Sequence, residues 1–124
     1  MTELKNKKTV VLGASPNPAR YANVAVHRLK EAGFEAIPVG IRGGEIADIP
    51  IQLDQPDVDD VHTISLYIGQ RHMSTWEDYA ISLQPKRIII NPGAENPEFE
   101  QKARNQGIEV VHACTLVMLS LNNF

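Results

Sequence analysis

Five short runs of mostly β-branched and other apolar residues limit the folds open to this chain. The runs lie at residues 9–12, 36–39, 61–66, 87–90 and 108–111. Near-continuous apolar runs of this length are typical of strands buried on both faces, as found in parallel sheets. Because helical patterns lie between most of them, the runs predict a parallel sheet built from strand–helix–strand units.

Apolar residues recur at helical spacing between these runs. Residues 21–32 repeat at intervals of three and four, which predicts an amphipathic helix that stops at Gly33. Residues 73–83 repeat in the same way, and Ser74 and Glu77 form a predicted capping box at the start of that helix.

The remaining segments complete the predicted fold. A third helix is expected to begin with Asn96 as its cap and Pro97 as its first residue. Residues 115–121 are apolar all round and are expected to be largely buried, whereas residues 40–60 suggest a loop with one short helix around 57–60. The predicted fold is a single-domain α/β Rossmann-like three-layer sandwich over residues 1–124. It has about five parallel strands in the order 3-2-1-4-5, with helices on both faces.

Composition and charge narrow the classes of partner. Twelve basic and fifteen acidic side chains give a net charge of −3, so no overall basic field attracts nucleic acid or a membrane. Cys114 is the single cysteine, which excludes an internal disulfide and a four-cysteine zinc site. The polar start and the short apolar run after it predict no signal peptide and no membrane span, so the cytoplasm is the expected location.

Ligands of such sheets bind beyond the carboxyl ends of the strands, and the first such loop is the most informative. Gly13, Ala14 and Ser15 follow the first strand, and a helix begins near Tyr21. Small residues allow the backbone to approach a diphosphate, and the helix N-terminus and Arg20 add donors and positive charge. A tight turn without a ligand explains the same residues.

The second loop bears on the type of nucleotide. NAD sites usually carry an acidic residue at the end of the second strand, but here Val39 is followed by Gly40, Ile41, Arg42 and Gly43. An arginine among glycines suits a phosphate on the ribose, as in NADP or coenzyme A. The alternative is a solvated arginine on a flexible loop.

Later loops give weaker signals. Asn91 could lend an amide and Gly93 could bring backbone close to a ligand, although this turn also leads simply into the third helix. His112 and Cys114 share one face of an extended segment and could form an activated thiolate, but no third group that would orient the histidine is identifiable, and a cysteine packed as a small hydrophobe is commoner. The aspartates at residues 54–60 match no calcium loop, so no metal site is predicted.

These residues together resemble the small stand-alone CoA-binding domain proteins of the YccU-like group. The group is similar to the N-terminal domain of the succinyl-CoA synthetase α subunit. The resemblance runs from Lys8 to about Leu121. Its elements are the turn at residues 13–15 with Pro18 and Arg20, the segment 33–39, the Arg42 loop, the Gly93 turn and the stretch 110–114.

The resemblance implies binding of coenzyme A or an acyl-CoA through its phospho-adenosine diphosphate moiety, as a non-catalytic module. Arg42 would face a phosphate and the loop from Leu66 to Gly69 would flank the adenosine, although this loop lacks the prolines of the synthetase. The synthetase's second domain, which carries its phosphorylated histidine, is missing, so ligase activity is not implied. The alternative is an NADP-binding or Cys114-dependent enzyme or redox sensor. The candidate ligand contacts are Gly13, Ala14, Ser15, Arg20, Tyr21, Val39, Arg42, Gly43, Leu66, Tyr67, Ile68, Asn91 and Gly93.

Overall fold

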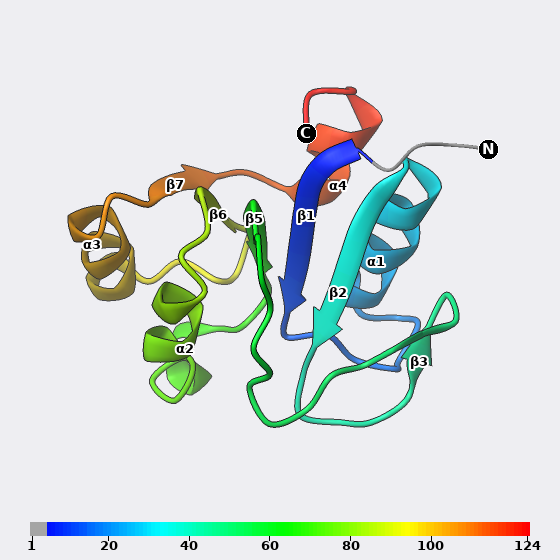
Figure 1. Ribbon diagram of the computed structural model, residues 1–124, viewed down its shortest axis with the longest axis horizontal. Helices are drawn as coiled ribbons and strands as arrows, with labels where there is room; N and C mark the ends of the chain where they lie inside the picture. Colours follow the sequence, from blue (N-terminus) through cyan, green and yellow to red (C-terminus); the bar gives the residue numbers. More distant parts are fainter. Residues whose placement is uncertain (1–4) are drawn as a thin grey trace.

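The computed structural model describes residues 5–124 and contains a five-stranded parallel sheet flanked by helices (Figure 1). This confirms the predicted α/β Rossmann-like class. The sheet strands are β1 (Lys5–Leu12), β2 (Phe34–Val39), β5 (Thr63–Leu66), β6 (Arg87–Ile90) and β7 (Glu109–His112). In Figure 1 the arrowheads of β1 and β2 point to the lower edge of the sheet, where the carboxyl-end loops lie.

The predicted strand order is wrong in one respect. The observed order is β2-β1-β5-β6-β7, which is 2-1-3-4-5 when the sheet strands are counted along the chain. β5 pairs with β1, with Thr9 opposite Thr63, so β2 stays at an edge and its outer side makes only an isolated bridge between Val39 and Gln52. Pro38 explains this placement, because proline cannot donate a ladder hydrogen bond and is confined to edge strands.

Helices cover both faces of the sheet, as expected. Alternate strand residues point to opposite faces. One set, with Val10, Ile64 and Ile88, packs against the side chains of α2 (Glu77–Ser82) and α3 (Pro97–Asn105). The other set, with Val11 and Ile89, packs against α1 (Tyr21–Glu31) and the side of α4 (Thr115–Ser120) that faces the sheet.

The two C-terminal helices differ in how well the sequence predicted them. Asn96 caps α3 by accepting a hydrogen bond from the Phe99 amide at 3.3 Å, and Pro97 is the first helical residue, as predicted. In α4 only Thr115 is buried, so the prediction of a largely buried segment is wrong. The sheet face beneath α4 is already shared with α1, and α4 therefore covers it with one side only, leaving Val117 51% exposed and Leu121, just beyond the helix, 65% exposed.

The segment before α2 is less helical than predicted. A 3₁₀ turn (Gln70–His72) and a further turn precede α2, whose N-cap is Trp76, so the Ser74–Glu77 capping box does not form. The Trp76 amide donates to the Met73 carbonyl at 2.8 Å, and this tight turn buries both side chains. Burial of these two large residues therefore outweighs helix propensity here.

The segment between β2 and β5 contains a small hairpin instead of a helix. β3 (Glu45–Ile46) and β4 (Ile49–Pro50) pair with each other, and no helix forms at residues 57–60. The chain then bonds back to the outer edge of β2, because the Gln52 amide donates to the Pro38 carbonyl at 2.9 Å. Residues 57–60, where a short helix was expected, form an irregular loop, and Asp60 has a φ of +57°, which a right-handed helix cannot contain.

Candidate functional site

A cavity of about 530 Å³ opens at the carboxyl ends of the strands. Its lining comes from the loops after β1, β2, β5 and β6 and from the start of α1. The strand order reverses between β1 and β5, and this switch point is where open α/β sheets bind their ligands. The predicted residues that line the cavity are Gly13, Ala14, Ser15, Arg20, Tyr21, Arg42, Tyr67, Ile68 and Gly93.

The other predicted residues do not line the cavity. Val39 and Leu66 are fully buried at the ends of their strands, and Gly43 lies just outside the cavity. The buried Asn91 amide donates to the Leu66 carbonyl at 2.9 Å, and its oxygen accepts from the Thr115 amide at 2.8 Å. Asn91 therefore joins two strands to the start of α4.

A second hollow, of about 600 Å³, lies along the outer edge of β2. It is lined by charged side chains of both signs, among them Lys8, Lys30, Glu35, Asp57 and Asp59. None of the predicted ligand contacts lies there. The cavity at the switch point is therefore the better candidate for the ligand site, although its volume is slightly smaller.

Two glycines bring the loops of the site together. A Cβ on Gly40 would lie 2.2 Å from the Ala14 carbonyl oxygen, and a Cβ on Gly13 would lie 3.0 Å from the Tyr67 backbone. Gly13 also has a φ of +99°, a conformation that other residues rarely adopt. The loops after β1, β2 and β5 thus approach as closely as their backbones allow.

The carbonyl of Val39 holds the first of these loops in place. It accepts hydrogen bonds from the amides of Gly13 and Ala14 at 2.9 and 3.0 Å. These amides are already bonded within the protein, so they are not free to bind a diphosphate. Gly13 and Ala14 instead provide a close-packed floor, and ligand donors must come from the neighbouring residues.

The start of α1 provides free donors. Arg20 is the N-cap residue and its side chain makes no capping bond. Among residues 5–124, no group accepts a hydrogen bond from the amides of Tyr21 or Ala22, which are at the first two helical positions and line the cavity. Unpaired amides and the helix dipole make such a terminus a natural anion site.

Local turns fix the loop that leads to this helix. The Ser15 hydroxyl accepts from the Asn17 amide at 3.1 Å, and the Asn17 side-chain oxygen accepts from the Ala19 amide at 2.9 Å. The Asn23 side chain donates to the Ser15 carbonyl at 2.9 Å. The approach to α1 is therefore shaped before any ligand arrives.

The charges of the cavity have one sign. The charged residues in its lining are Arg20 and Arg42, the lining includes His72, and no aspartate or glutamate of the described chain belongs to it. Both arginines are exposed and neither forms an ion pair with the residues that the structure describes. This arrangement suits a ligand with several negative charges.

At the β6 end of the cavity, Gly93 lies in a turn with a φ of +97°. Its amide donates to the two carboxylate oxygens of Glu95 at 3.0 and 3.2 Å. Tyr67 is partly buried nearby, and its hydroxyl has no hydrogen-bond partner among the described residues. Burial of this hydroxyl raises the pKa of Tyr67.

The chain matches one protein family over almost its whole length. A family model described as a CoA binding domain matches residues 7–120. The chain belongs to the CoA-binding domain family. This confirms the resemblance found from the sequence.

Solved structures share the fold of this chain. A crystal structure of an uncharacterized protein is 47% identical to this CoA-binding domain, covers 95% of it and 98% of its own chain, and has a TM-score of 0.92. A hypothetical protein from Pyrococcus horikoshii OT3 is 25% identical, over 93% and 82% of the two chains, with a TM-score of 0.81. A conserved hypothetical protein from Pyrococcus furiosus is 27% identical, over 90% and 97%, with a TM-score of 0.77. No curated protein matches the chain.

Two residues that line the cavity of this CoA-binding domain lie outside the loops expected to bind a ligand. Trp76 was expected only as a helix core residue, because the turns before α2 that bring it to the cavity have no clear sequence signal, and Ala22 lies within α1. The other lining residues lie in the loops after the strands, where a ligand was expected, although they were not named as contacts. They are Asn17, Gly40, Ile41, Gly69, His72, Pro92 and Ala94.

His112 and Cys114 do not form the hydrogen-bonded pair that the sequence left open. The His112 Nε2 atom lies 2.5 Å from a carboxylate oxygen of the buried Glu100, and no hydrogen bond joins His112 to Cys114 in residues 5–124. Cys114 is a partly buried N-cap residue of α4, and its carbonyl accepts from the Met118 amide at 3.0 Å. His112 is therefore oriented by Glu100 and not by the thiol.

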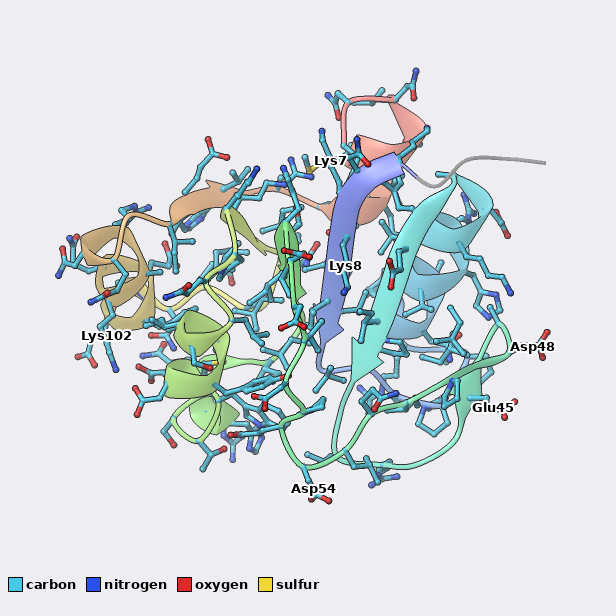
Figure 2. All side chains as sticks on the ribbon, in the orientation of Figure 1. Lys7, Lys8, Glu45, Asp48, Asp54 and Lys102 are labelled. Carbon is cyan, nitrogen blue, oxygen red and sulfur yellow. The ribbon has the colours of Figure 1, made fainter. Side chains whose placement is uncertain are left out.

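Neither a metal site nor a membrane span is found in the described part of the chain. Residues 5–124 contain no group of three His, Cys, Asp or Glu side chains that could hold a metal ion. Figure 2 shows Asp54 pointing away from the protein at a loop tip, and Glu45 and Asp48 pointing outward from the β3–β4 region. No helix in this range is long and apolar enough to cross a bilayer.

Proposed function

We propose that the cavity binds coenzyme A or an acyl-CoA through its phospho-adenosine diphosphate moiety, and that the protein is a non-catalytic binding module. The observation that supports this most is the single sign of charge at the site. Arg20, Arg42 and the free amides of α1 face a cavity whose described lining has no carboxylate. A volume of about 530 Å³ is also within the usual range for small-ligand sites.

In this proposal each part of the ligand has its own contacts. The diphosphate lies at the start of α1, where Arg20 and the amides of Tyr21 and Ala22 can bind it. The 3′-phosphate of the ribose pairs with Arg42, and the backbone of the Tyr67–Gly69 loop borders the adenosine. No residue of the described site forms a nucleophile–base pair of the kind that a covalent mechanism requires.

The pairing of Arg42 with the 3′-phosphate can be tested with dephospho-CoA, which lacks that phosphate. A hydrogen bond to a charged group contributes about 1.5–3 kcal/mol. Arg42→Ala should therefore weaken CoA binding about 10- to 150-fold. The variant should bind dephospho-CoA as the unchanged protein does, because the group that Arg42 contacts is already missing.

Titration of both ligands into both proteins by calorimetry completes the cycle. Arg28→Ala is the matched control, because Arg28 is an exposed arginine in the last turn of α1, outside the cavity. If the effects of Arg42→Ala and of phosphate removal simply add, then Arg42 does not contact the 3′-phosphate and this part of the proposal is wrong.

A further inference from the structure

Two large apolar side chains at the cavity are almost fully exposed. Tyr21 is 75% exposed and Ile41 is 79% exposed, and both line the cavity. They come from different elements, since Tyr21 is the first residue of α1 and Ile41 follows β2. No other large hydrophobic residue of the described chain is as exposed as these two.

Each of these apolar residues is next to an arginine that also lines the cavity. Arg20 precedes Tyr21, and Arg42 follows Ile41. A simple anion such as phosphate would use the arginines and leave both apolar side chains in water. A ligand that uses all four side chains must combine negative charges with a flat apolar group, which is the chemistry of a nucleotide.

We propose that Tyr21 and Ile41 form a clamp for the purine base of the ligand, an inference that rests on the proposed function. The Tyr21 ring stacks on one face of the base, and the Ile41 side chain packs against the base from the loop after β2. Stacking on an aromatic ring and removal of apolar surface from water both favour this placement. Arg20, beside Tyr21, then holds the diphosphate, and Arg42, beside Ile41, holds the 3′-phosphate of the same ribose.

The test uses CoA and adenosine 3′,5′-bisphosphate, which keeps the base and two phosphates but lacks the pantetheine arm. Loss of base stacking by alanine substitution typically weakens binding about 5- to 150-fold. Tyr21→Ala should therefore weaken both ligands by a similar factor in this range. Tyr21→Phe should keep the affinity of the unchanged protein, because the ring and not the hydroxyl makes the contact.

Proton NMR gives a signature that a purely structural role would not produce. In complexes with the unchanged protein and with Tyr21→Phe, the ring current of residue 21 should move the H2 and H8 resonances of the base. In Tyr21→Leu this contribution should be lost, although the side chain remains apolar and ligand still binds. Ile41→Ser should weaken both ligands, whereas Leu121→Ser, at an exposed apolar site outside the cavity, should not.

The outcomes separate this inference from the proposed function. If the unchanged protein binds CoA but Tyr21→Ala binds both ligands equally well, the clamp is wrong and the proposed function stands. The clamp is also wrong, and the proposed function stands, if the H2 and H8 resonances of the bound base are the same in the complexes of Tyr21→Phe and Tyr21→Leu. If the unchanged protein binds neither ligand, both the clamp and the proposed function are overturned.

Discussion

Substitution of Gly40 should disrupt the site through the backbone. A Cβ at this position would lie 2.2 Å from the carbonyl oxygen of Ala14, well inside van der Waals contact. The obstructing atom belongs to the backbone, so no side chain can move aside. Gly40→Ala must therefore separate the loops after β1 and β2, between which the Val39 carbonyl bonds to Gly13 and Ala14.

The cost follows from this overlap. Overpacking a close contact typically destabilises a protein by about 1–3 kcal/mol. At roughly 4 °C per kcal/mol for a chain of this size, the melting temperature of Gly40→Ala should fall by roughly 4–12 °C. The affinity for CoA should fall as well, because Arg42 would move away from the start of α1.

Gly43→Ala is the matched control, since a Cβ on Gly43 would have no neighbour within 4 Å. Thermal unfolding monitored by circular dichroism compares the two variants with the unchanged protein. Gly43→Ala should leave the melting temperature almost unchanged. If Gly40→Ala is as stable as Gly43→Ala, the close approach of the two loops does not hold the site together.

Two further predictions concern the β7 end of the sheet. Cys114→Ser should leave CoA affinity within about twofold of that of the unchanged protein. Treatment of the unchanged protein with oxidised CoA should give no adduct in intact-mass measurements. A CoA-sized adduct on Cys114 would favour the thiol-based alternative. Burial opposes ionisation of Glu100, but the Asn96 amide, His112 and Arg104 outweigh it and keep the pKa of this carboxyl below its usual value of 4.5. A lowered folded-state pKa stabilises the fold above the unfolded-state pKa, and this contribution is lost as pH falls through the folded-state value. Glu100→Gln should therefore cost about 1.5–3 kcal/mol at pH 7 and less at pH 4 in urea unfolding, and a cost independent of pH would contradict this assignment.

The sequence predicted the sheet well because its central strands β5 and β6 and the second half of β1 are almost fully buried. Runs such as Arg87–Ile90 are apolar almost throughout, and the structure has a strand with the same bounds. The strand order was wrong because the periodicity of a run carries no information about its neighbours. Pro38 did carry that information, because a proline in the second strand indicates an edge position.

The site was predicted less completely than the fold. Position after a strand was enough to identify Arg20 and Arg42, since residues there meet at the same edge of the sheet. Trp76 was missed because a buried aromatic residue at helical spacing looks like an ordinary core residue. The roles of Gly13 and Ala14 could not be predicted in detail, because whether their amides are free depends on the Val39 carbonyl of another strand.

Calorimetric titration of CoA, with NAD as the comparison ligand, shows directly whether this protein binds coenzyme A. Trp76 is the single tryptophan and lines the cavity, so its fluorescence can follow the same titration independently. We expect CoA to bind to one site per chain and to change the Trp76 emission. NAD should bind more weakly, because it lacks the ribose phosphate that Arg42 is proposed to hold. Tighter binding of NAD than of CoA, or no binding of CoA, would overturn the proposal that this cavity is a CoA site.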